Sequence, residues 1–503
     1  MHADTLHIYG TLHIGDGPHR QASIRVNDSG VLVLHKEARL FINDGSELEI
    51  GREGTLIIEK GVTIELDSGT IDTKGLLSLQ QDALLQPKGF GKLIFSENAA
   101  VSAEKDALVH LEDLEIRVKS TVVYPSLLNE FRLNRCKVYL SSNATILSNC
   151  TTHLWNTEFI KTGKKQNAAL TFSQGEVDIQ HCIFQGGAPA ITISDSVQWS
   201  MSNTTISNAH IGLYASAAPH LFSANTFMGN TTGGHITGDN YLLERSVFHS
   251  NDVGLIVRGR GKRAQIEACS FTSNSSVGLQ SIQTKLHVFC SEFSYNTMGI
   301  QALKGELKLA NNTGNTFNNN TIGIRFQNLE RLELQQGHNT FSQQVVFDLT
   351  GSFAPLASLS YNGSYHYIYA NNTSFSKVNS NFLTVGKDTV YVLYSSSQPP
   401  STLLCPSKGG KKKEGISWSR TEASPEFVVF PNPGSEWVEL VFPQTISTAE
   451  LTVFNSQGEQ IFIEQLPPGT YRKQLNIKGN AGLHLIRLID GKRINELRWL
   501  KLD

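Results

Sequence analysis

The sequence predicts an all-β protein: a right-handed parallel β-helix with about 21–24 residues per coil, followed by a small antiparallel β-sandwich. Three observations predict this architecture. An apolar anchor recurs between residues 180 and 344, a finer repeat runs through the first hundred residues, and short alternating strands follow residue 425. A constant period of this size is the signature of a stacked repeat. The anchors are Phe184, Ile206, Phe227, Phe248, Phe271, Phe293, Phe317 and Phe341.

The segments between the anchors exclude a helical array. They lack apolar residues at helical spacing and contain short alternating stretches such as Gly254–Val257 and Lys285–Phe289, set among Asn, Gly, Ser and Thr. A leucine-rich array needs several leucines at fixed offsets in each repeat, and the chain does not have them. A parallel β-helix remains, in which each strand pairs with its copy in the next coil. Crossovers between parallel strands are almost always right-handed, which predicts the hand.

Three sets of recurring residues have predicted roles in each coil. The phenylalanines are expected to stack in register at about the 4.8 Å spacing of neighbouring strands. One asparagine per coil is expected in a left-handed turn, with its amide bonded to its copies above and below. One glycine per coil is expected to supply a second sharp bend. The asparagines are Asn251, Asn274, Asn296 and Asn320, and the glycines are Gly254, Gly278, Gly299 and Gly323.

The first hundred residues repeat with a period of eight, so three units match one 24-residue coil. This pattern extends the same solenoid towards the N-terminus, while less regular coils are expected over residues 100–180. No export signal or polar cap precedes the first strand, and we therefore expect the native chain to begin upstream of Met1. The repeating apolar positions are Ile24, Leu32, Leu40, Leu48, Leu56 and Ile64.

Composition divides the chain into three parts. The solenoid is expected over residues 1–395, with an irregular end or cap at 345–395. Ser, Pro, Gly and Lys dominate residues 396–424, which predicts a linker. Seven short alternating strands within residues 425–503 predict the sandwich.

The overall composition narrows the classes of partner. Charged residues are 17% of the chain and the formal net charge is −2, so nothing favours nucleic acid or an anionic membrane. The apolar runs are far too short for a membrane span. The six cysteines show no metal-binding spacing, and most are expected to be buried free thiols. We predict a monomer with no cofactor and no metal.

The last module contains eight residues in a distinctive arrangement: Pro431, Asn432, Pro433, Gly458, Gly482, Asp490, Gly491 and Lys501. In these residues it resembles the C-terminal sorting domain of the type IX secretion system of Bacteroidetes. Leu483 and His484 depart from that family's usual aromatic residue. The resemblance implies that residues 425–503 engage the type IX machinery, that the chain is exported, and that the body is released or held at the cell surface. The ladder is similar to the right-handed β-helix repeats of the pectin-lyase-like group.

Two glutamates are the best catalytic candidates. Glu244 and Glu267 each lie four residues before the phenylalanine of their coil, which predicts stacking at roughly 5 Å. That spacing is near the separation of the two carboxyl groups in retaining glycosidases. Four basic residues nearby could bind an acidic glycan, although an extended, solvated loop is the simpler interpretation. These are Arg258, Arg260, Lys262 and Arg263.

Two functional hypotheses follow. The favoured one is an exported cell-surface or extracellular protein, non-catalytic, that binds glycans, adheres or serves as a structural rod. The alternative is a polysaccharide lyase or glycoside hydrolase of the β-helix type. The low charge density and the smooth Asn, Ser and Thr pattern favour the first.

Overall fold

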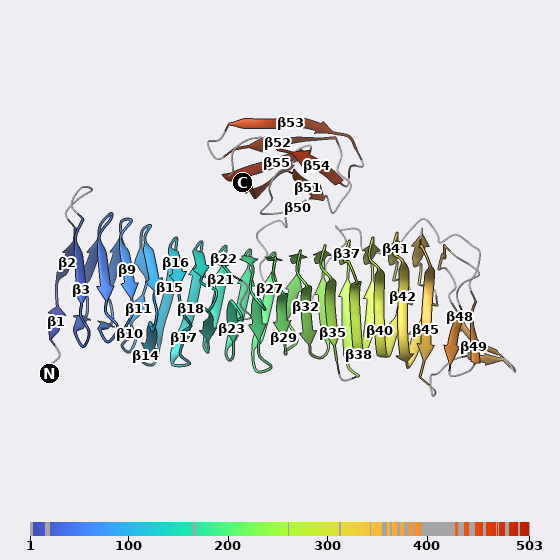
Figure 1. Ribbon diagram of the computed structural model, residues 1–503, viewed down its shortest axis with the longest axis horizontal. Helices are drawn as coiled ribbons and strands as arrows, with labels where there is room; N and C mark the ends of the chain where they lie inside the picture. Colours follow the sequence, from blue (N-terminus) through green and yellow to red (C-terminus); the bar gives the residue numbers. More distant parts are fainter. Residues whose placement is uncertain are drawn as a thin grey trace. The chain divides into compact units, whose positions relative to one another are not determined.

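The computed structural model shows a chain built from strands, β1–β56, and its described residues contain no helix (Figure 1). The chain divides into two compact units, Met1–Cys405 and Pro406–Asp503. The described residues are 4–15, 21–163, 167–259, 261–310, 313–335, 337–342, 344–354, 360–362, 365–369, 373–376, 382–385, 388–393, 428–430, 437–441, 448–455, 459–468, 470, 472–477, 482–490 and 493–501. The predicted linker at 396–424 lies outside them.

The N-terminal coils contain three short strands each. Strands β1 (Thr5–Ile8), β4 (Val31–Leu34), β7 (Thr55–Ile58) and β10 (Leu76–Leu79) pair in parallel, so every third strand is a neighbour. Leu32 lies opposite Leu56, which sets the coil at 24 residues. Two apolar side chains per strand point inward because alternate residues of a strand face opposite sides. The eight-residue period is confirmed.

The same stacking continues through the first unit. One parallel sheet of 15 strands runs from β3 (Ser23–Val26) to β44 (Thr340–Ser342), and Figure 1 shows its strands stacked side by side along the first unit. In the middle of the chain one coil consists of β33 (Tyr241–Glu244), β34 (Val247–His249) and β35 (Val253–Arg258). The fold is a right-handed parallel β-helix, as predicted.

The phenylalanine ladder forms the core of this sheet. Phe248 lies opposite Phe271, and their rings stack at 4.9 Å with an interplanar angle of 5°. Phe271 stacks on Phe293 in the same way. Both Phe248 and Phe271 are fully buried. The in-register stacking of the anchors is confirmed.

The asparagine ladder has the predicted bonds but a different backbone conformation. Asn274 Oδ1 accepts the backbone N–H of Asn251 at 3.1 Å, and Asn274 Nδ2 donates to Asn296 Oδ1 at 2.9 Å. The left-handed residue, however, is the one before each asparagine, such as Ser250 (φ 53°) and Ser273 (φ 56°). The prediction of a left-handed asparagine is wrong because the amide must point inward, where it satisfies buried backbone groups. A second set of buried asparagines lies at a different turn of the coil, where each side chain donates to a backbone carbonyl oxygen. These are Asn225, Asn315 and Asn339.

The recurring glycines do not bend the chain. Gly254 and Gly278 lie inside strands and are absent from the positive-φ residues. A Cβ atom at Gly278 would lie 2.8 Å from the carbonyl oxygen of Gly299 and 3.1 Å from the Phe271 Cβ. The glycines are therefore required by close approach between coils, and the predicted bend is wrong.

The described residues of the C-terminal unit form an antiparallel sandwich of seven strands, as predicted. One sheet has the order β50-β51-β54 and the other β53-β52-β55-β56. Leu440 from the first sheet and Val453, Ile486 and Trp499 from the second belong to one buried core. The strands are β50 (Val428–Phe430), β51 (Trp437–Val441), β52 (Ala449–Phe454), β53 (Gln460–Leu466), β54 (Arg472–Asn476), β55 (Gly482–Asp490) and β56 (Arg493–Lys501).

Most of the described cysteines are buried free thiols, as expected. They are Cys136, Cys150, Cys182 and Cys269. Cys290 differs from them because it is disulfide-bonded.

Candidate functional site

The outer face of four consecutive coils carries a dense set of polar and aromatic side chains. The four strands are β15 (Ala107–Glu112), β18 (Leu128–Asn134), β21 (Thr151–Trp155) and β24 (Glu176–Gln180). Buried and partly exposed residues alternate along each strand, so every second side chain points outward. One outward column is His110, Arg132, His153 and Asp178, and the next is Glu112, Asn134, Trp155 and Gln180. We call this surface the Trp155 face.

Trp155 is the centre of this face and is partly buried. Its indole Nε1 donates to Asp178 Oδ2 at 3.0 Å. The guanidinium carbon of Arg132 lies 5.0 Å from the centre of the indole ring, within cation–π range. The His153 ring lies 5.3 Å away at a tilt of 42°. The ring is thus held at the surface by polar neighbours from both adjacent coils.

Asp178 collects the hydrogen bonds of this face. Besides the indole N–H it accepts Gln180 Nε2 at 2.8 Å, and His153 Nδ1 lies 4.0 Å away. Burial acts to raise the pKa of Asp178, but His153 and the bonds from Trp155 and Gln180 outweigh it and lower the pKa. The carboxylate therefore stays charged, and about a fifth of its side chain (21%) remains exposed.

A second carboxylate, that of Glu130, contacts Arg132 and His110 of the first column. Glu130 Oε1 accepts Arg132 Nε at 2.8 Å and lies 2.6 Å from Arg132 Nη2. His110 Nε2 lies 3.4 Å from the same oxygen. Burial lowers the pKa of His110. The neighbouring Arg132 and His153 lower it further, whereas the Glu130 carboxylate acts to raise it. The His110 imidazole is therefore neutral at pH 7.

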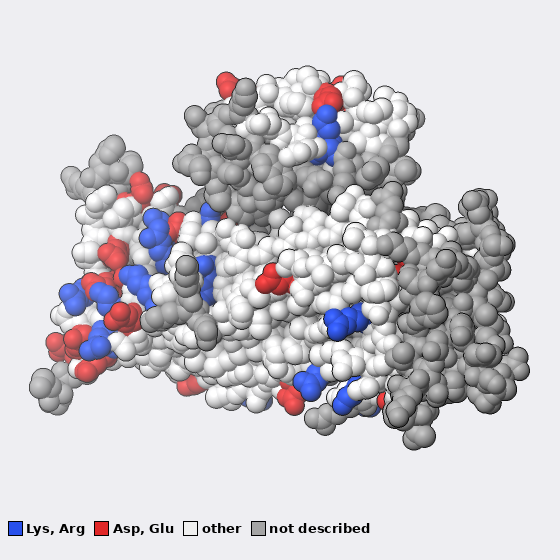
Figure 2. Space-filling view, turned by 45° about the vertical axis from the view of Figure 1, so that its right-hand side comes forward, with Lys and Arg blue, Asp and Glu red and all other residues white. Residues whose placement is uncertain are grey.

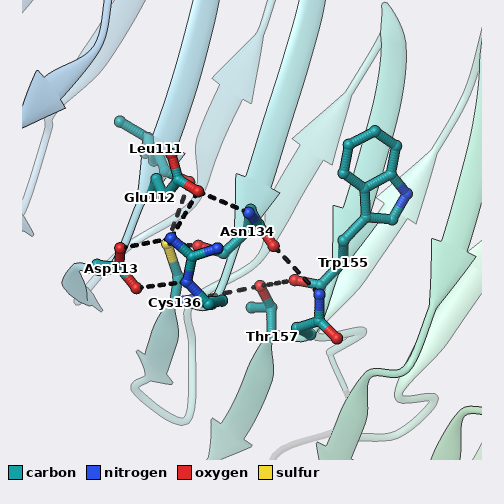
Figure 3. A network of polar contacts seen from close by, with 9 residues as sticks. Leu111, Glu112, Asp113, Asn134, Cys136, Trp155 and Thr157 are labelled. Carbon is teal, nitrogen blue, oxygen red and sulfur yellow. Dashed lines mark hydrogen bonds and ion pairs between the residues drawn. The ribbon is translucent and has the colours of Figure 1, made fainter.

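A network on the adjoining turn braces the second column (Figure 3). Arg135 donates through Nε and Nη2 to the two carboxylate oxygens of Asp113 at 2.8 and 2.7 Å. Its Nη2 also lies 2.8 Å from Glu112 Oε1, which accepts Asn134 Nδ2 at 2.7 Å. Figure 3 shows Trp155 at the border of this network, where Thr157 Oγ1 donates to its carbonyl oxygen at 2.8 Å. These bonds hold the backbone that presents the indole.

The two glutamates predicted from the sequence lie farther along the same face. Glu244 in β33 and Glu267 in β36 (Arg263–Glu267) are directly in register. Ser223 Oγ donates to Glu244 Oε1 at 2.9 Å. Burial raises the pKa of Glu267, the neighbouring Glu244 raises it further, and Arg245 opposes both. The pair therefore places a carboxyl group with a raised pKa directly beside a second carboxyl group.

The basic residues do not join this pair. Lys262 forms an ion pair with Asp239 at 2.6 Å, Arg258 ends β35 as an exposed residue, and Arg263 begins β36, four residues before Glu267. Among the described residues, neither glutamate forms a hydrogen bond or ion pair with any of these three. Arg260 lies outside the described residues.

The sorting-motif residues are only partly described. Gly482 pairs with Lys501 across β55 and β56, and Asp490 pairs with Arg493 where the same two strands end. Pro431, Asn432, Pro433, Gly458 and Gly491 lie outside the described residues.

Sequence reasoning missed the Trp155 face. A signal was present: His110 and Glu112, Arg132 and Asn134, His153 and Trp155, and Asp178 and Gln180 are four polar or aromatic pairs at i, i+2, recurring every 21–25 residues. It was overlooked because unlike residues in register produce no visible repeat.

Charged side chains are unevenly distributed along the first unit. In the view of Figure 2 they gather over the N-terminal coils, and the coils that follow show few. Among the described residues, no three His, Cys, Asp or Glu side chains come together as a metal site. No helix in the described part of the chain is long and apolar enough to span a membrane.

Comparisons with known proteins agree with the architecture. The family model for the right-handed beta helix region matches residues 189–345. No curated protein matches the chain. The matched residues lie within the β-helix described above.

Several solved structures are similar in outline. The periplasmic alginate epimerase AlgG has 9% identity and a TM-score of 0.36, covering 64% of this chain and 77% of that one. Tailspike protein 2 of Escherichia coli O157:H7 bacteriophage CAB120 has 10% identity and a TM-score of 0.22, covering 95% and 64%. Tailspike protein gp49 of Acinetobacter baumannii bacteriophage Fri1, a capsular polysaccharide depolymerase, has 10% identity and a TM-score of 0.14, covering 95% and 73%. None of these likenesses extends to function.

Proposed function

We propose that this protein is an exported β-helix protein that binds glycans through the Trp155 face. The observation that carries the proposal is the indole of Trp155, held by Asp178 and Arg132 on an outer face rich in carboxylate, amide and imidazole groups. An aromatic ring offers an apolar surface to the C–H side of a sugar, and the surrounding polar groups bind its hydroxyls. Few, well-fixed polar groups around an aromatic contact are typical of ligand sites.

Export is the second part of the proposal. We propose that residues 425–503 form a sorting module for the type IX machinery, joined by a linker at 396–424 to a solenoid at 1–395, and that the protein acts as a monomer outside the cell or on its surface. The seven-stranded sandwich is consistent with the resemblance. The disulfide at Cys290 adds support, since disulfides persist in oxidising compartments.

Affinity gel electrophoresis of the full chain tests the binding proposal. Gels containing different polysaccharides are compared, and at least one is expected to retard the protein. Trp155→Ala is expected to abolish most of that retardation. Tyr139→Ala is the matched control, because Tyr139 is also a partly buried aromatic residue on an outer strand face but belongs to the 15-stranded sheet. Equal retardation of wild type and Trp155→Ala would contradict the proposal.

A glycoside hydrolase is the second candidate function. Glu244 and Glu267 favour it because they are in register, about 4.8 Å apart by strand spacing, and burial together with the neighbouring Glu244 raises the pKa of Glu267. Two carboxyl groups in different surroundings are how retaining glycosidases separate acid from nucleophile. Release of reducing ends from any retarding polysaccharide, lost in both Glu244→Gln and Glu267→Gln, would establish hydrolysis. Binding of a polysaccharide without release of reducing ends would support the non-catalytic role.

A further inference from the structure

The Trp155 face and the glutamate pair belong to one continuous column of side chains. Starting from Trp155, successive coils place these residues directly in register: Gln180, Ser202, Ser223, Glu244, Glu267 and Phe289. Six steps at the strand spacing give about 29 Å. The stretch from Trp155 to Phe289 therefore has an aromatic residue at each end and runs parallel to the axis of the β-helix.

A neighbouring column, two residues earlier in each strand, widens this surface. It consists of His153, Asp178, Ser200, Leu221, Leu242 and Gln265. Leu221 is 41% exposed, which is unusual for a leucine on a strand face and leaves an apolar spot halfway along the surface. We call the two columns together, from Trp155 to Glu267, the axial track.

Side-chain size suits an elongated ligand. Ser200 and Ser202 are short side chains in register with Asp178 and Gln180, and they lie between the indole of Trp155 and the side chains of Glu244 and Glu267. Ser223 is buried and donates its hydroxyl to Glu244. Ser202 and Gln265 are partly exposed and can contact a ligand. The track thus alternates hydrogen-bonding groups with an apolar contact along its length.

The charge of the axial track favours neutral over anionic polysaccharides. The twelve residues of the axial track include three carboxylates, Asp178, Glu244 and Glu267, and no lysine or arginine. Arg132 and Arg245 lie only at its margins, beside Trp155 and near Glu267 respectively. A polyanion laid along this surface would meet like charges, which opposes binding, whereas the hydroxyls of an uncharged sugar can donate to the same carboxylates.

We infer that the axial track binds an extended neutral polysaccharide parallel to the solenoid axis, with Trp155 and the Glu244–Glu267 pair contacting different parts of one chain. The inference rests on the proposed glycan binding and adds the class of ligand and its direction. Contacts over several coils reinforce one another because sites joined in a single chain bind together.

The first test uses the full chain and defined polymers. Dextran, galactomannan and hydroxyethylcellulose serve as neutral probes, and polygalacturonate and alginate as anionic probes, in affinity gels. At least one neutral polymer is expected to retard the protein and the anionic ones are not. Retardation only by the anionic polymers would overturn the inference while leaving glycan binding intact. Failure of every polymer would overturn both proposals.

The second test examines direction and length. Oligosaccharides of the retarding polymer are titrated by calorimetry, and affinity is expected to rise with length until the oligomer spans the track. Ser202→Tyr places a bulky side chain in the middle of the track. It is expected to lower the affinity for the longest oligosaccharide about tenfold, because that ligand then loses its contacts at one end. Thr205→Tyr, in the same coil but on the 15-stranded sheet, is the control.

The outcomes of this second test separate the two proposals. If Trp155→Ala abolishes binding but length and Ser202→Tyr have no effect, the ligand occupies only the Trp155 face and the axial track is refuted. Unchanged melting temperatures of both tyrosine variants will show that a loss of affinity does not come from misfolding.

Discussion

The indole N–H of Trp155 donates to Asp178 on the next coil at 3.0 Å, so an aromatic surface residue is fixed by a carboxylate from a different repeat. The two residues are diagonal neighbours, because Asp178 lies opposite His153 and Trp155 lies opposite Gln180. The β-helix converts residues 23 positions apart in the chain into neighbours on a single face. A rigid, oriented indole loses little conformational freedom when a ligand packs on it.

Asp178 should therefore matter for binding even where it does not touch the ligand. Asp178→Ala removes the acceptor of Trp155 Nε1 and Gln180 Nε2, and polysaccharide affinity is expected to fall about tenfold, the equivalent of one charge-assisted hydrogen bond. Asp178→Asn, which retains an acceptor oxygen, should lose less. Affinity gels measure both. An unchanged affinity in Asp178→Ala would show that the indole needs no such support.

The asparagine ladder should dominate the stability of the middle coils. In Asn274→Ala the buried N–H of Asn251 and the carbonyl of Phe248 lose their partners, and the expected cost in the free energy of unfolding is about 3 kcal/mol. Urea unfolding followed by circular dichroism measures it. Asn129→Ala, at an exposed position of β18, is the control and should change stability by less than about 0.5 kcal/mol. Equal midpoints for the two variants would refute a structural role for the ladder.

The glycine column should tolerate no side chain. Gly278→Ala would place a Cβ 2.8 Å from the backbone oxygen of Gly299, so neighbouring coils must separate. We expect a loss of roughly 1–3 kcal/mol, typical of overpacking, seen as a lower melting temperature. Gly10→Ala, where nothing lies within 4 Å of the new atom, should melt like the wild type. A normal melting temperature for Gly278→Ala would mean that the coils are less tightly stacked than described.

Lys161 predicts a specific dependence of stability on pH. It is buried, donates through Nζ to the carbonyl oxygens of Ala144 (2.5 Å) and Ala168 (3.0 Å), and burial lowers its pKa from 10.5 to about 8. Between these two values the unfolded chain binds more protons than the folded chain, so stability rises with pH across this window and is independent of this group below about 8.

The measurement is the melting temperature of wild type and Lys161→Met from pH 7 to 10.5. The wild type should gain stability relative to the variant as the pH rises above about 8. Comparison with the variant removes the contribution of other groups that titrate at high pH. Parallel curves for the two proteins would contradict the prediction.

The proposed sorting module can be tested independently of ligand binding. In a host that carries a type IX secretion system, an export signal fused to the full chain should deliver it to the cell surface or medium. Removing residues 425–503 should leave the remainder in the periplasm, as measured by fractionation. Delivery of both forms would refute the sorting role and would leave the glycan-binding proposal unaffected.

Much of the architecture is readable from the sequence. Phe248, Phe271 and Phe293 repeat because identical positions in successive coils meet the same neighbours, so stacking selects the same residue type at each one. The same logic reveals the eight-residue units of the N-terminal coils. The alternation of apolar residues also predicts the seven strands of the C-terminal sandwich, since each sheet buries one face.

The sequence alone determined the period, the strand composition and the interior of this protein, because burial imposes the same requirement on every coil. Only the tertiary structure decided what lies outside. It showed that Gly278 serves close packing, that Ser273 rather than Asn274 takes the left-handed turn, and that Trp155, Asp178 and Glu267 share one face. The physical reason is that outward side chains differ from coil to coil, so their neighbours are set by the register of the stacked strands, which a search for identical repeating residues does not reveal.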